Sequence, residues 1–319
     1  KTSSTEVSFG GTKTLEGKDL EKDQFTFELQ ETDDKWAAKK GVEAKTASNG
    51  EGGAYRFGSI KYDKAGTYYY TVKEQNGGKT ENGISYDGTV YQIKVEVKDD
   101  GNGNLVAEVT GADGQKLNGQ KLDFKNTYKT SSTEVSFGGT KTLEGKDLEK
   151  DQFTFELQET DDKWAAKEGV EAKTASNGEG GAYSFGSIKY DKAGTYYYTV
   201  KEQNGGKTEK GISYDGTVYK IKVEVTDDGN GKLVAKATGA DTTKLDFKNT
   251  YKAGGTEVSF GGTKSLEGKS LKEGQFTFEL QETDDKWAAK EGVEAKTASN
   301  GEGGAYSFGS IKYDKAGTY

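Results

Sequence analysis

The chain has 319 residues, a length typical of about two domains at roughly 150 residues each, and a formal net charge of −8 at pH 7. It contains no Cys and no His, which excludes disulfides, zinc sites built from thiolates or imidazoles, and nucleophilic triads that depend on either residue. Only 31% of the residues are hydrophobic, a share that already includes the 19 Tyr and 3 Trp, so we expect a small core that would benefit from a covalent link other than a disulfide.

Charge and hydropathy exclude two further classes of partner. Acidic and basic residues are interleaved and form no basic stripe that could neutralise a phosphate backbone, so we expect no nucleic-acid partner. The apolar runs are only a few residues long, so we expect no membrane span in this segment, and a secretion signal would lie outside it. We also expect neither a cofactor nor a metal site.

The first 128 residues are typical of a series of short strands. Apolar and polar residues alternate with period two, the pattern of half-buried strands, and turn signals rich in Gly, Asn and Asp separate the segments. Seven such strands without a sustained helical period predict an all-β, immunoglobulin-like antiparallel β-sandwich. The segments are TEVSF (5–9), QFTFELQ (24–30), AYRFGSI (54–60), TYYYTVKE (67–74), TVYQIKVEV (89–97), NLVAEV (104–109) and LDFKNTY (122–128).

Three segments allow a second interpretation. The stretch KWAAKKGVEAK (35–45) has a helix-forming composition, but Gly41 makes a loop or short strand equally reasonable. Within TYYYTVKE, period two places Tyr68 and Tyr70 in the core and Tyr69 on the surface. The segment DDGNGN (99–104) resembles part of a calcium loop, but it lacks the downstream bidentate Glu, so we interpret it as a hairpin turn.

The same pattern then repeats along the chain. The segment KTSSTEVSFGGTKTLEGKDL begins at Lys1 and again at Lys129, and a third copy follows Lys252 as AGGTEVSFGGTKSLEGKSL. We therefore expect three modules, 1–128, 129–251 and an incomplete 252–319, cut as a window from a longer array. Nearly all differences between the first two modules exchange one polar residue for another, as between Lys40 and Glu168, which is expected of solvent-facing positions.

Three polar residues of the first module occupy the phase of their strand that should face the core. Lys13 lies in the inward phase of the first strand, Glu74 ends the apolar stripe of TYYYTVKE, and Asn126 follows Phe124 on the inward face of the last strand. A desolvated Lys loses its charge and becomes a nucleophile, whereas a desolvated Glu gains a proton. An amine beside a carboxamide, with a protonated carboxyl to polarise the carbonyl oxygen and shuttle protons, could form a Lys-Asn isopeptide bond and release ammonia.

Three alternatives remain open at this point. The three groups could form only a satisfied polar cluster, with Lys13 ion-paired to Glu74 and Asn126 bonded to both. A bulge at Gly10 and Gly11 could shift the register and turn Lys13 outward. Glu31 continues the inward phase of FTFELQE and is a second candidate acid, whereas Glu28 should face water.

The ordered motifs GTKTLEGKDL, QFTFELQE, AGTYYYTVKE, GISYDGTVYQIKVEV and LDFKNTY resemble the pilin isopeptide-linkage domain of Gram-positive pilins and surface adhesins, a relative of collagen-adhesin B-type modules. In that family the early Lys bonds to the Asn of the terminal F-x-N-T-Y motif, and the Glu of Y-x-V-x-E is the catalyst. The resemblance therefore implies two sites and an incomplete third one, in which the partners of Lys264 fall beyond the end of the chain. The residues are Lys13, Glu74 and Asn126 in module 1, Lys141, Glu202 and Asn249 in module 2, and Lys264 in module 3.

These observations favour a structural role: an extracellular stalk on a Gram-positive cell surface, in an adhesin or a pilus-like fibre, anchored to the cell wall through regions outside this segment. The crosslinking would occur once per module, so we do not expect an enzyme with turnover. The expected partners are neighbouring modules of the same chain, and self-association into fibres by strand complementation from module 3 is a further hypothesis. The alternative function is a ligand-binding adhesin repeat that recognises a host glycan or protein.

Overall fold

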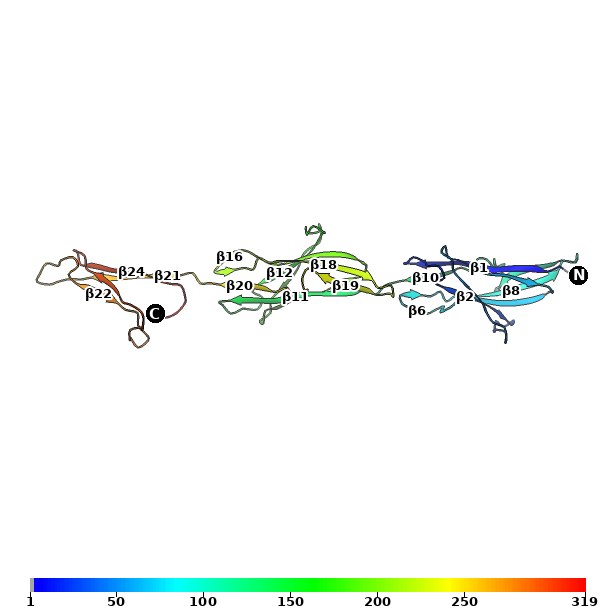
Figure 1. The fold of residues 1–319 in the computed structure, drawn as a ribbon, viewed down its shortest axis with the longest axis horizontal. Helices are drawn as coiled ribbons and strands as arrows, with labels where there is room; N and C mark the ends of the chain where they lie inside the picture. Colours follow the sequence, from blue (N-terminus) through cyan, green and yellow to red (C-terminus); the bar gives the residue numbers. More distant parts are fainter. Residues whose placement is uncertain (1–2) are drawn as a thin grey trace. The chain divides into compact units, whose positions relative to one another are not determined.

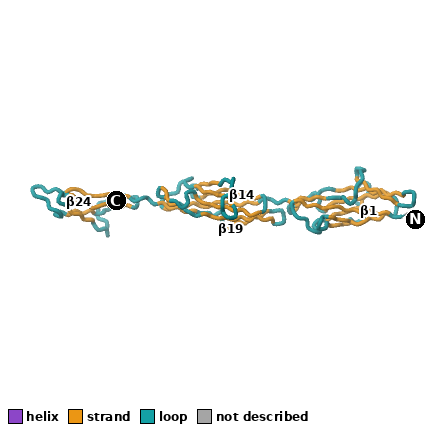
Figure 2. Tube along the Cα trace, turned by 90° about the horizontal axis from the view of Figure 1, so that it is seen from above, coloured by secondary structure: helices purple, strands orange, loops and turns teal. Residues whose placement is uncertain are grey.

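The computed structural model describes residues 3–319, and strands account for all of their regular secondary structure (Figures 1 and 2). The chain forms three repeated all-β modules, as the alternating pattern predicted. The stretch 35–45 contains no helix; apart from the first residue of a later strand it is a loop held by an isolated bridge between Thr32 and Ala38. In the described part of the chain, no helix is long and apolar enough to cross a membrane.

Module 1 consists of two five-stranded sheets that enclose one core. The first sheet has the order β4-β1-β10-β7-β6 and the second has the order β3-β2-β5-β8-β9. The strands are β1 (Thr5–Glu16), β2 (Thr26–Thr32), β3 (Lys45–Ser48), β4 (Ala54–Tyr62), β5 (Gly66–Glu74), β6 (Thr80–Glu81), β7 (Ile84–Ser85), β8 (Val90–Asp99), β9 (Leu105–Gly111) and β10 (Phe124–Tyr128).

Module 2 repeats this arrangement, with the sheets β14-β11-β20-β17-β16 and β13-β12-β15-β18-β19. Its strands are β11 (Thr133–Glu144), β12 (Thr154–Thr160), β13 (Lys173–Ser176), β14 (Ala182–Tyr190), β15 (Gly194–Glu202), β16 (Thr208–Glu209), β17 (Ile212–Ser213), β18 (Val218–Asp227), β19 (Leu233–Thr238) and β20 (Phe247–Tyr251).

Module 3 contains two strand pairs, β21-β24 and β22-β23, because the sequence ends at Tyr319, before the counterparts of β8 and β10. The side chain of Phe260 is 38% exposed, whereas its counterparts Phe9 and Phe137 are buried. The strands are β21 (Thr256–Thr263), β22 (Thr277–Leu280), β23 (Lys296–Ser299) and β24 (Ala305–Tyr313).

Aromatic rings supply much of the small core. In module 1, Phe27 stacks on Tyr55 with ring centroids 3.9 Å apart and on Phe124 at 5.3 Å, so rings from both sheets meet in the centre of the sandwich. Tyr70 is buried as expected, but Tyr68 and Tyr69 are both half-buried. Tyr69 is covered by the ring of Trp36, with an interplanar angle of 87°. Such edge-to-face contacts stabilise a core that has few aliphatic residues.

The pairing of the first and last strands departs from the antiparallel pattern of the rest. β1 and β10 are parallel, with Lys13 opposite Phe124 and Leu15 opposite Asn126. The segment before β10 crosses β1 at its two glycines, where Leu122 N–H donates to Gly10 O at 3.1 Å and the Tyr55 hydroxyl donates to Leu122 O. β10 therefore reaches its position beside β1 through a crossover connection rather than a hairpin.

Gly11 permits that crossing, because a Cβ at this position would overlap the backbone of Leu122. We predict that Gly11→Ala exposes residues 115–128 to faster amide hydrogen exchange, at a cost of about 1–3 kcal/mol typical of overpacking. Exchange measured by mass spectrometry should leave the matching segment of module 2 unchanged. The control is Gly52→Ala, since a Cβ there meets nothing within 4 Å; equal protection in the two variants would contradict this account.

Candidate functional site

The three polar side chains that the alternation placed inside module 1 are buried together between its sheets. Lys13 on β1 and Asn126 on β10 come from one sheet, whereas Glu74, at the end of β5, comes from the other. Their exposed fractions are 2%, 0% and 2%. The site therefore exists only when both sheets are assembled.

The pairing of β1 with β4 does shift register beside Gly10, but the shift does not turn Lys13 outward. Phe9 pairs with Gly58 and Gly10 pairs with Arg56, so the extra residue of the bulge is Phe57 in β4. Because β1 itself gains no residue, its alternation continues through the bulge and Lys13 stays on the inner face.

Aromatic rings exclude water from the amine of Lys13. Its Nζ lies 4.8 Å from the centre of the Phe25 ring and 6.0 Å from that of Phe27, which faces Glu74 across the β2-β5 pair. The rings offer weak cation-π attraction but no hydrogen-bond acceptor that could replace water. The charged form of the amine is therefore poorly solvated here.

Lys13 and Glu74 form a desolvated pair. The Nζ of Lys13 forms an ion pair with Oε1 of Glu74 at 2.7 Å, and Oε2 of Glu74 has no hydrogen-bond partner among the described residues. Burial lowers the pKa of the Lys13 ammonium and raises the pKa of the Glu74 carboxyl, while the attraction between the two opposes both changes. Both shifts favour a neutral amine beside a neutral acid, which is the pair that acyl transfer to the amine requires.

The carboxamide of Asn126 is held at both of its polar atoms. Nδ2 donates to Oε1 of Glu74 at 2.8 Å, and Oδ1 accepts from the backbone N–H of Asp87 at 2.7 Å. A backbone N–H can only donate, which fixes the orientation of the amide. We expected the Glu carboxyl to polarise the carbonyl oxygen, but it contacts the amide nitrogen instead, since the oxygen is taken by Asp87. The alternation of apolar and polar residues does not single out Asp87, although ISYDGTVY recurs unchanged at 212–219.

Module 2 brings the same three groups together, with the difference that Oε2 of its acid accepts a hydrogen bond from the lysine. Lys141 Nζ lies 2.8 Å from Oε1 and 2.9 Å from Oε2 of Glu202, and Asn249 Nδ2 donates to Oε1 at 2.8 Å. The N–H of Asp215 donates to Oδ1 of Asn249 at 2.7 Å. Burial again lowers the pKa of the Lys and raises the pKa of the Glu. In module 3, Lys264 lies half-buried over Phe276, and the chain ends before its partner positions.

The rival acids lie elsewhere. Glu31 is 30% exposed and forms an ion pair with Lys39, because the alternation of β2 breaks at its end and Thr32 takes the buried position instead. The interpretation of Glu31 as a core acid was therefore wrong. Glu28 is 27% exposed and pairs with Lys73 on the surface, as expected.

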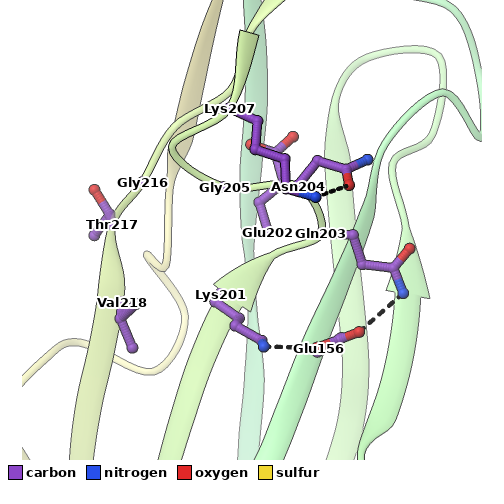
Figure 3. A pocket seen from close by; sticks show the side chains of 10 residues that line it. All are labelled: Glu156, Lys201, Glu202, Gln203, Asn204, Gly205, Lys207, Gly216, Thr217 and Val218. Carbon is purple, nitrogen blue, oxygen red and sulfur yellow. Dashed lines mark hydrogen bonds and ion pairs between the residues drawn. The ribbon is translucent and has the colours of Figure 1, made fainter. Parts of the chain in front are cut away.

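An open pocket lies beside the acid in each complete module. In module 2 it is lined by residues of the turn 203–207 that follows Glu202 and by the segment 216–218 (Figure 3). Figure 3 shows Lys201 and Gln203 pointing toward Glu156. Nζ of Lys201 lies 3.3 Å from Oε2 of Glu156, and Nε2 of Gln203 donates to its Oε1 at 2.9 Å. The buried centre therefore lies near solvent on this side without being exposed to it.

Three segments of the chain, residues 9–129, 137–252 and 260–319, match the sequence model of the Spy0128-like isopeptide containing domain. The chain belongs to this family, whose domain is a structural pilin domain rather than a known class of enzyme. A pilin of Streptococcus pyogenes serotype M1 is 26% identical over 217 residues, which is 63% of this chain and 61% of the pilin.

Two solved structures are also similar to this chain. The major pilin from Streptococcus pyogenes has 17% identity and a TM-score of 0.28, with 77% of this chain and 96% of the pilin covered. Two B repeat units of the collagen binding protein of Staphylococcus aureus have 18% identity and a TM-score of 0.28, with 98% and 66% covered.

The burial of the pair predicts unequal roles for Glu74 and Glu31 in stability. In a chain with Asn126→Ala, which has no carboxamide to react with Lys13, Glu74→Ala leaves the Lys13 amine in a dry interior without its counter-ion and should destabilise module 1 by roughly 3–5 kcal/mol. Glu31→Ala removes only an exposed pair and should cost less than about 1 kcal/mol. Urea unfolding followed by fluorescence of Trp36, with Trp164 and Trp287 replaced by Phe, measures both; similar midpoints would be evidence against the buried pair.

Proposed function

We propose that each complete module closes one covalent bond between its first and last strands, Lys13 to Asn126 in module 1 and Lys141 to Asn249 in module 2. The observation that carries the proposal is the buried contact of an amine, a carboxyl and a carboxamide at a site where burial favours the neutral forms of the first two. Membership of an isopeptide-containing domain family supports the same chemistry.

The reaction balances without a cofactor. A proton passes from Lys13 to Glu74, and the neutral Nζ then adds to Cγ of Asn126. Glu74 donates its proton to Nδ2, with which it is already in contact at 2.8 Å, and the Cγ–Nδ2 bond breaks. The acid recovers a proton from the new amide nitrogen, and one ammonia leaves. The nearby pocket offers it a short route to solvent.

We propose further that the modules carry tension as a stalk segment of a cell-surface adhesin or pilus-like fibre of a Gram-positive bacterium. The bond would close a loop of about 110 residues, which restricts the unfolded chain by roughly 4.7 kcal/mol in the entropic account. Force entering at β1 and leaving at β10 would pass through the bond and bypass the residues between them. Membership of the isopeptide-containing domain family and the similarity to a pilin of Streptococcus pyogenes support this role and an extracellular location.

Intact mass tests the chemistry. The full chain should weigh less than its sequence by the mass of two ammonia molecules, because Lys264 has no partner within the chain. Asn126→Ala should restore one ammonia, and Asn126→Ala with Asn249→Ala should restore both. The exposed Asn118 provides the control, since Asn118→Ala should keep the full deficit. A tryptic digest should also yield a branched peptide that joins the segments of Lys13 and Asn126. An unmodified mass for the wild-type chain would refute the proposal.

Force spectroscopy tests the mechanical role. When the chain is pulled from its ends, modules 1 and 2 should release no long extension. Asn126→Ala should add one step of roughly 370–400 Å, the contour of the residues that the bond bypasses. The step should be absent in Asn118→Ala, and a wild-type chain that releases two such steps would contradict a stalk built on these bonds.

A further inference from the structure

We propose that Asp87 is part of the catalytic centre: its backbone N–H stabilises the negative charge that develops on Oδ1 of Asn126 when the amine of Lys13 adds to Cγ. Its carboxylate holds that donor in place. This inference rests on the crosslinking reaction proposed above, and Asp215 has the same role in module 2.

The placement of the donor carries the argument. Asp87 N lies 2.7 Å from Oδ1 of Asn126, the atom that gains charge in the tetrahedral intermediate, and Asn126 is fully buried. A donor that is fixed before the reaction stabilises such a charge most strongly where water is excluded. Glu74 cannot serve this atom, because its carboxyl contacts Nδ2 on the other side of the carboxamide. Glu74 thus acts at the leaving nitrogen of the carboxamide, whereas the N–H of Asp87 acts at its oxygen.

The carboxylate of Asp87 fixes the loop that presents this donor. Its Oδ2 accepts from the backbone N–H of Lys125 at 2.8 Å, and Lys125 directly precedes Asn126 on β10. Its Oδ1 accepts from the N–H of Thr89 at 2.9 Å and from the Thr89 hydroxyl at 2.6 Å. The loop is therefore tied both to the strand that carries the reacting amide and to the start of β8.

The same hydrogen bonds keep the carboxyl group of Asp87 ionised. Burial alone would raise the pKa of this carboxyl, but the hydrogen bonds donated by Lys125 and Thr89 outweigh that effect, so its pKa lies below the usual value. The residue remains an anion with three donors around it. Its charge raises the pKa of Glu74, which favours the protonated acid, and it also raises the pKa of Lys13, a smaller opposing effect than the burial of that amine.

The loop also separates the reacting oxygen from solvent. Gly88 and Thr89, which follow Asp87, line the open pocket of module 1, and no part of Asn126 is exposed. Water on that side is therefore kept from Oδ1. The stabilising donor must come from the chain itself.

Module 2 contains the same set of bonds. The N–H of Asp215 donates to Oδ1 of Asn249 at 2.7 Å, and Oδ2 of Asp215 accepts from Lys248 N at 2.8 Å. Thr217 donates to Oδ1 of Asp215 from its N–H at 2.9 Å and from its hydroxyl at 2.6 Å. One chain thus contains two centres with these same bonds. The rate of bond closure in an altered module 1 can therefore be compared with the rate in the unaltered module 2 of the same molecule.

The first experiment removes the donor alone. The α-hydroxy analogue of Asp, placed at position 87 of the full chain by stop-codon suppression in cell-free synthesis, replaces the N–H by an ester oxygen and keeps the carboxylate. The ratio of branched to unbranched peptide is followed in both modules after synthesis. Closure of module 1 should be about 100-fold slower than closure of module 2, the usual effect of losing one oxyanion donor. Equal rates in the two modules would overturn the inference.

A second experiment tests the carboxylate. Asp87→Ala should slow closure of module 1 by about tenfold or more, because the donor loses its anchor to Lys125. The matched control is Asp113→Ala, which removes an exposed loop carboxylate that also accepts a backbone N–H and should leave the rate unchanged. Equal closure rates of module 1 in these two variants would contradict a positioning role for the Asp87 carboxylate.

A spectroscopic readout separates chemistry from folding. In a chain with Lys13→Met and Lys141→Met, which cannot crosslink, the ester at position 87 should move the ¹³Cγ resonance of Asn126 upfield and leave that of Asn249 in place. An unmoved Asn126 resonance in a folded module would count against polarisation by this donor.

The outcomes also distinguish this inference from the proposal on which it rests. If neither module of the wild-type chain loses ammonia, the crosslinking reaction itself is wrong. If module 2 closes and the ester-substituted module 1 closes as fast, the reaction is right and only the assignment of Asp87 fails.

Discussion

An amine kept away from water is the constraint on which the rest of this protein depends. Lys13 can lose its charge only where Phe25, Phe27 and the facing sheet exclude solvent, and its acid comes from that facing sheet. In an unfolded chain the same amine is solvated and protonated, so it is not a nucleophile. The proposed chemistry is therefore coupled to folding: the bond closes after the sandwich has formed and then prevents it from opening.

This constraint explains why a module with so small a core retains a buried ion pair. Two charges placed in a dry interior rarely gain enough from their attraction to repay their lost hydration, and well-packed apolar residues would be at least as stable. Lys13 and Glu74 thus contribute little to a folded state held by noncovalent contacts alone. Their presence is understandable if the pair is a reactant, since the amide that replaces it carries no charge.

The sequence predicted those features of the site that depend on one strand at a time. Lys13, Glu74 and Asn126 each follow the alternation of their own strand, so their burial could be predicted. The exposed position of Glu31 could not, because the alternation of β2 breaks where Thr32 turns inward. Neither could the parallel pairing of β1 with β10, which depends on how the chain crosses Gly11, nor the donor at Asp87, since every non-proline residue has a backbone N–H and the sequence does not tell which one meets a given side chain.

The parallel pairing also bears on a crosslink between neighbouring modules, which their nearly identical sequences would otherwise allow. The strand sequence TEVSFGGTKTLE occurs both as β1 and as β11. Lys13 and Lys141 therefore have the same flanking sequence, and Lys141 is much nearer to Asn126 along the chain. Yet two strands that run in the same direction need a connection of about a dozen residues to become neighbours, and only residues 129–132 separate β10 from β11. The connection is too short for Lys141 to reach Asn126 in this arrangement, so in the proposed reaction each module bonds to its own first strand.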